Sequence, residues 1–245
     1  MLTLGTITTA ASNPGGFFED VAYKGAFDPN GANWAAGWTL AYGMDNVYSY
    51  NSTDTVTVSG NITSNTTWNK ETLYILDGFV FVTGGAELTI EAGTMIQAKS
   101  GQRENASALI IKKDGTIMAE GTADMPIVFT ALDDTYKGES YDMTIPGLWG
   151  GVIVLGEAPT NNSADKRIEG IPEEYNAYYG GSDAADNSGV LKYISIRHGG
   201  TNIGAGNEIN GLSLGGVGNG TTIDYIEVIA NKDDGVEWFG GTANT

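Results

Sequence analysis

The sequence contains no cysteine, which excludes disulfides, thiolate metal sites and cysteine nucleophiles. Its single histidine, His198, also excludes a metal site built from several imidazoles. Basic residues are few: 12 Lys and Arg stand against 30 Asp and Glu, a net charge of −18. A chain this acidic repels phosphate backbones and anionic lipid, so we expect no nucleic-acid partner and no membrane-surface binding.

Long apolar runs and helical patterns are missing as well. No apolar run approaches the roughly 20 residues that cross a bilayer, so we expect no membrane insertion. The amino end, Met1–Gly16, lacks the basic and apolar regions of an export signal, which would have to precede it in an exported protein. In place of helical spacing, short β-type runs recur between Gly, Asn, Asp and Thr turns, for example Tyr74–Val82, Ile127–Ala131 and Val152–Leu155.

The spacing of these runs predicts a coil rather than a series of hairpins. LKYISI, which begins at Leu191, returns as IDYIEV at Ile223, and LSLGG, which begins at Leu212, returns as VEWFGG at Val236. A repeat of roughly 20 to 32 residues built from three short strands is typical of a parallel β-helix. We therefore expect an all-β protein in which residues 55–245 form a parallel β-helix.

Three segments depart from the coil pattern. Residues 1–54 are rich in Trp, Tyr, Gly and Asn, and we interpret them as an aromatic cap or intersubunit segment. Insertions at about 132–146 and 158–189 are long, acidic and rich in Gly, Asn and Tyr. Insertions of a solenoid usually emerge on one face, which is often the binding face.

Several long motifs resemble a known group of proteins. They include ILDGFVFVTGGAELTIEAGTMIQA, SALIIKKDGTIMAEGTADMPIVFTA, LWGGVIVLGEAP, LKYISIRHGG and NGLSLGGVGNGTTIDYIEVIANKDDGVEWFGGT. These motifs closely resemble secreted right-handed parallel β-helix proteins of the Bacteroidetes, which are exported by type IX secretion. The resemblance covers roughly Thr55–Thr245 and implies a right-handed β-helix at the cell surface or beyond, without implying a reaction.

The order of the segments differs from that group. FFEDVAYKGAFDPNGANWAAGWT resembles the segment that closes the β-helix in these proteins, yet here it precedes the β-helix. By the offset between Leu191 and Ile223, the chain also stops halfway around a coil. One explanation is a fragment or repeat unit of a longer chain. The other is end-to-end assembly, in which the amino-terminal segment of a neighbour covers the unpaired last rung and repeated contacts give a filament.

Two sets of residues are candidates for binding. Asp233 and Asp234 lie in NKDDG, a tight turn between two rungs that could supply oxygen ligands to calcium, unless they simply form a solvated acidic surface. Aromatic side chains gather in two segments. Three roles are open for such rings: stacking on sugars, anchoring an interface, or packing on their own coil. The first set is Phe27, Trp34, Trp38, Tyr42, Tyr48 and Tyr50, and the second is Tyr175, Tyr178 and Tyr179. For Phe27, Trp34, Trp38 and Tyr42 we favour an interface between subunits or cap packing.

Catalysis is the weaker prediction. Sugar hydrolases need carboxylates that converge on one bond, and calcium-dependent lyases need an Arg or Lys base beside the metal. Arg103, Arg167 and Arg197 lie in no such motif, and we expect His198 to be a turn residue that closes a strand. We therefore expect no catalytic residue, no enzyme activity and no cofactor other than calcium.

The predicted function is structural. We expect an extracellular or cell-surface protein that self-associates head to tail into a homopolymer through its β-helix rungs. The alternative is a carbohydrate-binding module, or a β-helix similar to polysaccharide lyases and hydrolases, with a polysaccharide as its partner.

Overall fold

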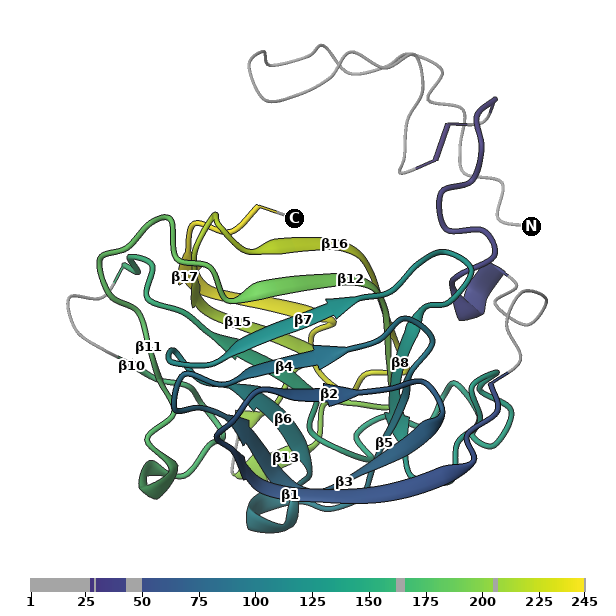
Figure 1. Cartoon of the computed structure of the whole chain (residues 1–245), viewed down its shortest axis with the longest axis horizontal. Coiled ribbons are helices and arrows are strands. Elements are labelled where there is room, and N and C mark those ends of the chain that lie inside the picture. The colour runs from purple at the N-terminus through teal and green to yellow at the C-terminus, as the bar shows by residue number, and fades with distance from the viewer. Residues whose placement is uncertain (1–26, 29, 43–49, 162–165, 205–206, 245) are drawn as a thin grey trace. The chain divides into compact units, whose positions relative to one another are not determined.

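The computed structural model describes residues 27–28, 30–42, 50–161, 166–204 and 207–244. The chain divides into two units, Met1–Ala36 and Gly37–Thr245. In the first unit, Phe27 and Trp34 stack with ring centroids 5.3 Å apart. The second unit holds every strand of the described residues (Figure 1).

Strands account for nearly all regular structure in the described residues. They are β1 (Asp54–Ile62), β2 (Thr66–Trp68), β3 (Thr72–Val82), β4 (Glu87–Ile90), β5 (Met95–Ala98), β6 (Ala108–Ile111), β7 (Thr116–Glu120), β8 (Ile127–Ala131), β9 (Val152–Leu155), β10 (Lys166–Arg167), β11 (Tyr178–Tyr179), β12 (Gly189–Arg197), β13 (Asn202–Gly204), β14 (Asn207–Glu208), β15 (Leu212–Val217), β16 (Thr222–Ile229) and β17 (Val236–Gly241). Three short 3-10 helices accompany them: η1 (Leu40–Tyr42), η3 (Arg103–Asn105) and η4 (Glu173–Tyr175). Among the described residues, no helix is long and apolar enough to cross a membrane.

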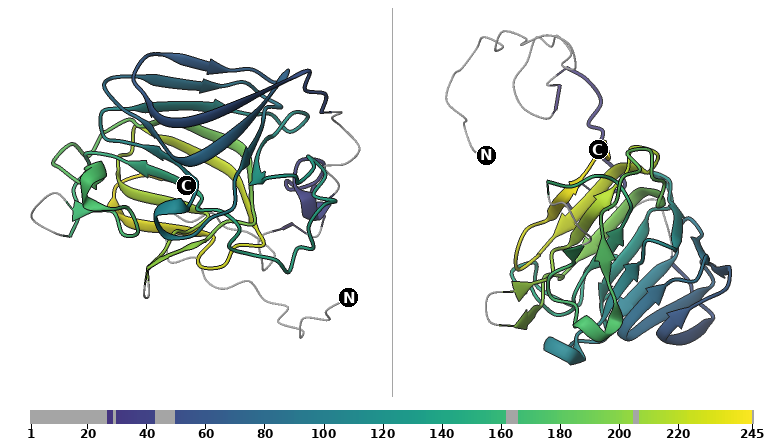
Figure 2. Two further views of the ribbon diagram at one scale, coloured as in Figure 1. Left: turned by 90° about the horizontal axis from the view of Figure 1, so that it is seen from below. Right: turned by 90° about the vertical axis from the view of Figure 1, so that its left-hand side faces the viewer.

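Thirteen strands form one coiled, all-parallel sheet with three ladders, which the chain visits in turn. Ladder A runs through the first halves of β1 and β3, then β5, β8 and the second halves of β12 and β16. Ladder B runs through the second halves of β1 and β3, then β6, β9, β15 and β17. Ladder C comprises β2, β4, β7 and the first halves of β12 and β16. Figure 2 shows the strands stacked coil upon coil, which confirms the predicted right-handed parallel β-helix.

The core lies inside the coil, where side chains of successive strands stack in rows. Alternate residues of a strand point inward, so paired apolar residues fall one above the other. One such row of ladder B contains Ile62, Val82, Ile111, Val154, Leu214 and Trp238. The first five are buried, whereas Trp238 in the last coil is 48% exposed.

The coils differ in length because some corners carry long segments. Along ladder A, the shortest spacing joins the paired residues Asp54 and Thr72, and the longest joins Ile127 of β8 to Ile194 of β12. We call the coil between β8 and β12 the long coil, and it contains the connections 132–151 and 156–188, which the predicted insertions overlap. The predicted offset between Leu191 and Ile223 is confirmed, since these two residues pair.

The outward surface of ladder B is covered by apolar side chains. Its outward residues include Phe81, Ile153 and Leu155, and they pack against Ile168 and Tyr179 of the 156–188 connection. Ladder C differs because its outward side chains, such as Thr89 and Thr222, remain partly or fully exposed. The outward face of ladder B is therefore covered by apolar contacts, and that of ladder C is open to solvent. Ladder A differs from both and is described next.

Candidate functional site

The outward row of ladder A is polar and yet buried. Gln97 of β5 pairs with Thr130 of β8, and Arg197 ends β12 in the following coil. These side chains are only 6%, 0% and 0% exposed. Buried polar groups require hydrogen-bond partners, and here the 132–151 connection supplies them.

Asp134 fixes the connection to the ladder with both its side chain and its main chain. Its Oδ2 accepts a hydrogen bond from Thr130 Oγ1 at 2.7 Å, and its Oδ1 accepts one from Ser140 N at 3.3 Å. Its main-chain oxygen accepts a bond from Gln97 Nε2 at 2.6 Å. The buried carboxylate is therefore used to hold the connection in place.

Arg197 holds the next two residues of the connection, Thr135 and Tyr136. Its Nη1 donates to the main-chain oxygens of Tyr136 at 2.7 Å and Thr135 at 3.4 Å. Its Nε donates to Ser195 Oγ at 3.0 Å, and Ser195 Oγ donates to Glu227 Oε2 at 2.6 Å. Burial lowers the pKa of Arg197, while the nearby carboxylates of Glu227 and Asp134 act in the opposite direction. A buried guanidinium thus links the ladder to the connection that covers it.

His198 closes β12 as a turn residue, as the sequence indicates. Its φ of 59° ends the alternation of the strand, and its main-chain N donates to Ile229 O of the next coil at 3.1 Å. Nδ1 lies 2.7 Å from Ile145 O, and since a carbonyl oxygen only accepts, Nδ1 carries the proton. Nε2 has no hydrogen-bond partner among the described residues and lies 4.0 Å from Asp134 Oδ2. Arg197 and His198, although neighbours in sequence, both contact the 132–151 connection, because the positive φ of His198 ends the alternation of the strand.

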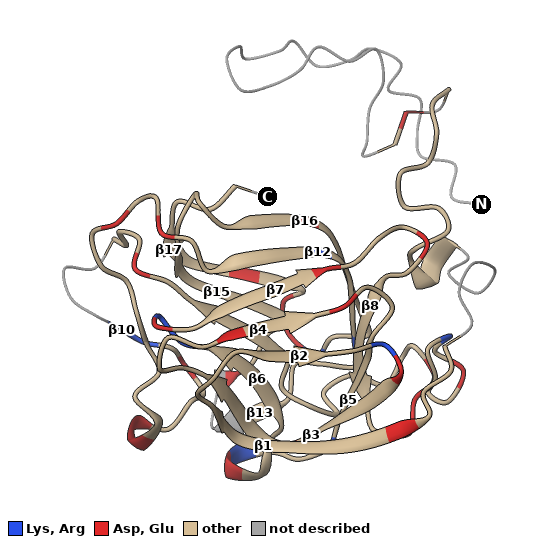
Figure 3. Cartoon of the chain, in the orientation of Figure 1, with Lys and Arg blue, Asp and Glu red and all other residues tan. Residues whose placement is uncertain are grey.

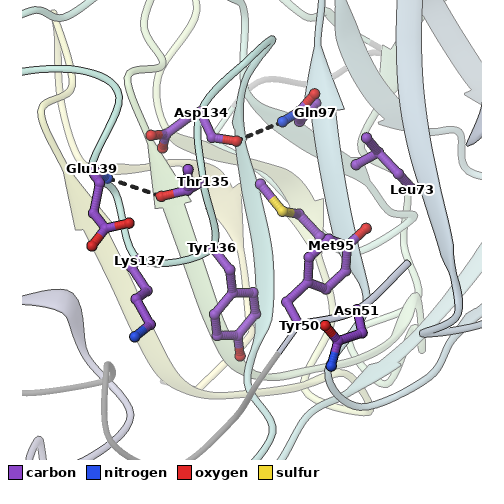
Figure 4. A pocket seen from close by; sticks show the side chains of 10 residues that line it. All are labelled: Tyr50, Asn51, Leu73, Met95, Gln97, Asp134, Thr135, Tyr136, Lys137 and Glu139. Atoms are coloured by element: carbon purple, nitrogen blue, oxygen red, sulfur yellow. Dashed lines mark hydrogen bonds between the residues drawn. The ribbon is translucent and has the colours of Figure 1, made fainter. Parts of the chain in front are cut away.

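A cavity of about 450 Å³ lies where this connection meets the earlier coils (Figure 4). Its floor is formed by Leu73 of β3 and by Met95 and Gln97 of β5. Its walls are formed by two short segments, 50–51 and 134–139. This volume is within the range of sites that hold small ligands, about 300–1,000 Å³.

Two tyrosines make part of the cavity lining aromatic. The rings of Tyr50 and Tyr136 are parallel to within 6°, with centroids 5.9 Å apart, and both pack near Met95. Tyr136 is held at both ends, since its hydroxyl donates to Pro126 O at 2.8 Å and its main-chain oxygen accepts from Arg197. The cavity thus combines fixed aromatic rings and an apolar floor with polar groups at its rim.

Asn51, Lys137 and Glu139 supply these polar groups, and Figure 4 shows them around the aromatic pair. Lys137 and Glu139 carry opposite charges, so the rim is close to neutral. The carboxylate of Asp134 is occupied by Thr130 and Ser140, which leaves Glu139 as the other carboxylate among the lining residues. This arrangement suits binding of a flat, hydroxyl-rich molecule better than acid–base chemistry with two carboxyl groups.

The four predicted interface residues fall in two different units of the chain. Trp38 is 1% exposed and packs edge-on against Tyr193 and Tyr225, at 5.5 and 6.1 Å between centroids. Tyr42, in the same unit, is 50% exposed. Phe27 and Trp34 belong to the unit Met1–Ala36, where Trp34 is 48% exposed. Their contact with another subunit stays a prediction.

The remaining aromatic residues have different outcomes. Tyr48 lies outside the described residues, as does most of the segment 1–54. In the second cluster, Tyr175 stacks on Phe81 at 5.1 Å, and Tyr179 is buried in the apolar cover of ladder B. These two rings therefore pack on their own coil.

Asp233 and Asp234 lie in the corner between β16 and β17, and both are exposed. Other carboxylates lie nearby: burial raises the pKa of Glu237, and the charges of Asp234 and Asp233 raise it further. Burial likewise raises the pKa of Glu169, with contributions from Glu237 and Asp233. In the part of the chain that the structure describes, no group of three or more metal-binding side chains gathers. Calcium at Asp233 and Asp234 stays a prediction.

The cavity-lining residues Leu73, Met95, Gln97 and Tyr136 are not identified as a site from the sequence. A usable signal is present in ladder A, where outward strand positions carry Gln97, Thr130 and Arg197 in otherwise apolar runs. Polar outward residues followed by a long insertion indicate that the insertion folds back over that face.

The fold and the covered ladder define the class: a parallel β-helix protein with a cavity between one strand face and an inserted connection. In comparisons with known proteins, the family model of the pectate-lyase-like β-helix domain matches residues 60–245. The chain belongs to this family. No curated protein matches the chain, and no solved structure does.

Proposed function

We propose that this protein is a non-enzymatic carbohydrate-binding β-helix of the cell surface or extracellular space, and that the ladder A cavity holds a sugar chain. The observation that carries the proposal is the parallel pair of Tyr50 and Tyr136 above the apolar floor of Leu73 and Met95. Aromatic faces stack on the C–H faces of sugar rings, and amides and charged groups bind the hydroxyls. The pectate-lyase-like family supports a carbohydrate as the class of ligand.

The charge of the protein favours a neutral sugar over an acidic one. The chain carries a net charge of −18, and Figure 3 shows Asp and Glu in many loops and strand ends, with few Lys and Arg. A polyanion such as pectate would be repelled over this surface. The rim charges, Lys137 and Glu139, balance each other and so do not favour an anion.

The state of the carboxylates in the cavity supports binding without cleavage. Sugar hydrolysis requires a pair of carboxyl groups on either side of the bond, about 5 to 9.5 Å apart. Asp134 cannot supply one freely, because both its oxygens accept hydrogen bonds that hold the cavity wall.

Calorimetric titration with cellohexaose, xylohexaose, mannohexaose and trigalacturonate tests the proposal. We expect one of the neutral hexaoses to bind and trigalacturonate to bind more weakly. Tyr136→Ala should reduce the affinity at least about fivefold, because an aromatic anchor is typically worth more than about 1 kcal/mol. Tyr136→Phe, which keeps the ring, should retain most of the binding.

The matched control is Tyr175→Ala, which removes a similar ring from ladder B. An equal loss of affinity in Tyr136→Ala and Tyr175→Ala would contradict the proposed site. Release of new reducing or unsaturated sugar ends during incubation would contradict a non-enzymatic role.

End-to-end assembly is a second proposal, and it rests on the apolar surface of the outer coils. Trp238 and Val56 point inward along their rows yet are 48% and 44% exposed. A hollow of about 230 Å³ lies beside Trp238 and is lined by Leu212, Ile226 and Val236, among others. Side chains of this kind are normally covered by the next coil, so another copy of the β-helix would bury them.

Sedimentation velocity and negative-stain electron microscopy, each with calcium and then with chelator, test assembly. We expect polymers that Trp238→Ser abolishes and that Ile145→Ser, a change at another exposed apolar residue, leaves intact. Loss on chelation would support calcium at Asp233 and Asp234. Monomers in all conditions would overturn the assembly proposal without affecting carbohydrate binding.

A further inference from the structure

The segment Gly37–Tyr42, which we call the docked segment, lies against the last coils of the β-helix. Trp38 anchors it: the indole is 1% exposed and meets the rings of Tyr193 and Tyr225 edge-on. Those two rings stack on each other in successive coils, 4.2 Å apart and parallel to within 6°. An aromatic platform built by β12 and β16 therefore receives the buried indole of the docked segment.

Leu40 makes the next contact, and it is polar. Its main-chain N donates to both carboxylate oxygens of Glu227, at 2.9 and 3.1 Å. Glu227 lies on ladder A beside Ser195, with which it is paired across the strands. The docked segment thus binds the same carboxylate that receives the hydrogen bond of Ser195.

From Glu227 a continuous set of hydrogen bonds leads to the cavity. Ser195 Oγ donates to Glu227 and accepts from Arg197 Nε, and Arg197 Nη1 donates to Tyr136 O. Each of these distances is 3.0 Å or less. Every group in the path has its orientation set by its neighbour, so a displacement of Glu227 alters the bonds that position the ring of Tyr136.

The docked segment also contacts the cavity wall directly. Gly138 stands between the cavity residues Lys137 and Glu139, and a Cβ at Gly138 would lie 2.9 Å from Leu40 Cδ2. The φ of Gly138 is +69°, a conformation that glycine adopts without strain. The side chain of Leu40 therefore rests on the backbone of the cavity wall.

We infer that docking of Gly37–Tyr42 is coupled to ligand binding in the cavity: the docked segment sets the wall that contains Tyr136, and a ligand on that wall strengthens docking. Two sites joined by differential contacts must affect each other reciprocally. The ligand half of this inference rests on the proposed carbohydrate site, whereas the coupling between segment and wall does not. The docked segment then regulates the site rather than forming part of it.

Trp38→Ala tests the inference because it weakens docking without altering a cavity residue. We expect the affinity for the bound hexaose to fall by about 5- to 150-fold, the usual range of coupling between two sites. Tyr175→Ala, the control on ladder B, should leave the affinity unchanged. Reciprocally, saturating hexaose should slow hydrogen exchange at the amide of Leu40 in the unaltered protein.

The methyl carbon of Met95 gives a readout that needs no ligand. Met95 is packed beside Tyr50 and Tyr136, so the ring currents of both tyrosines determine its NMR signal. Trp38→Ala should shift this signal, and Tyr175→Ala should not. Glu227→Gln serves as the second variant in case Trp38→Ala fails to fold, and it should shift the signal in the same way because it disturbs the contacts of Leu40 and Ser195.

The outcomes separate the two proposals. If no hexaose binds but the Met95 signal shifts in Trp38→Ala, the carbohydrate site is wrong and the coupling stands. If a hexaose binds and neither its affinity nor the Met95 signal responds to Trp38→Ala and Glu227→Gln, the coupling is overturned.

Discussion

Ladders A and B are both covered by connections from the same long coil, but by opposite chemistry. On ladder B, outward Phe81, Ile153 and Leu155 meet apolar side chains of the 156–188 connection and form a closed cluster. On ladder A, outward Gln97 and Arg197 donate to main-chain oxygens of the 132–151 connection, and Thr130 donates to the carboxylate of Asp134.

The difference bears on the cavity with the tyrosine pair, which lies on ladder A; a second hollow, of about 360 Å³, lies where polar residues such as Lys112, Asp114 and Glu157 meet at the edge of ladder B. Apolar packing has no preferred direction, so side chains move until the gap is filled. Hydrogen bonds demand fixed distances and angles, so the connection on ladder A is held at particular points. The space beside those points stays open, and it is there that Tyr50 and Tyr136 enclose the cavity.

The largest expected effect is the loss of the buried cation of ladder A. Arg197→Met removes the donor to Ser195 Oγ and leaves the carboxylates of Glu227 and Asp134 without a nearby positive charge. Removing one member of a buried charged network typically costs about 3–5 kcal/mol of unfolding free energy. Urea denaturation followed by circular dichroism measures it, and a loss below about 1 kcal/mol would contradict the importance of Arg197.

A truncation on ladder B should cost nearly as much but act differently. Ile153→Ala, at a side chain 1% exposed, should lower the unfolding free energy by about 2–5 kcal/mol. Because it lies under the apolar cover, it should leave the Met95 methyl signal in place, whereas Arg197→Met should move it. If both variants moved that signal, the two faces would not be independent.

The effect of pH should be smaller and confined to the corner beside ladder B. Burial and the charges of Asp234 and Asp233 raise the pKa of Glu237. A raised pKa in the folded state means that folding takes up a proton, so this contribution to stability is lost as the pH rises through the folded value. Glu237→Gln should therefore be stabilising relative to the unaltered protein at neutral pH, and this advantage should shrink as the pH falls toward the ordinary pKa of a glutamate.

Denaturation midpoints of Glu237→Gln and of the unaltered protein, measured at several pH values, give this difference in stability directly. Thr57→Ala, a change at an exposed residue of β1 that has no titratable group, is the control and should show no such trend. An advantage of Glu237→Gln that grew as the pH fell would show that the sign is wrong.

The smallest effect is expected for an exposed ion pair on the outer surface of the coil. Lys99 Nζ and Asp77 Oδ2 are 2.7 Å apart, but their side chains are 43% and 48% exposed. Such pairs contribute about 0.2–1 kcal/mol, so Lys99→Met should change the unfolding free energy by no more than this. A loss comparable to that of Arg197→Met would remove the distinction between buried and exposed polar contacts.

Much of the coil can be predicted from the sequence because its register repeats there. The offsets between Leu191 and Ile223 and between Leu212 and Val236 are the observed strand pairings. The Thr-rich segment of β1 gives a weaker strand signal, because it lacks an apolar run. It pairs with β3 in spite of this, since alternate residues such as Val58 still face the core. A strand at the rim of a coil buries little, so its pattern is weak.

The cavity cannot be predicted in the same way. It joins residues such as Met95 and Tyr136 that lie in different coils and share no repeat. Which face an inserted connection covers depends on where it turns, and here single residues with positive φ, such as Asp133 and His198, decide that. The sequence indicates that insertions exist, but it contains no periodic signal for where they fold back.

The uneven coil lengths also bear on the order in which the molecule folds. The pairing of Ile127 with Ile194 closes a far longer loop than the pairing of Tyr74 with Ile96. Closing a loop about three times as long costs about 1 kcal/mol more in chain entropy, before the covering contacts of either connection have formed. We therefore expect the coils before and after this junction to assemble separately and to join last, across β8 and β12.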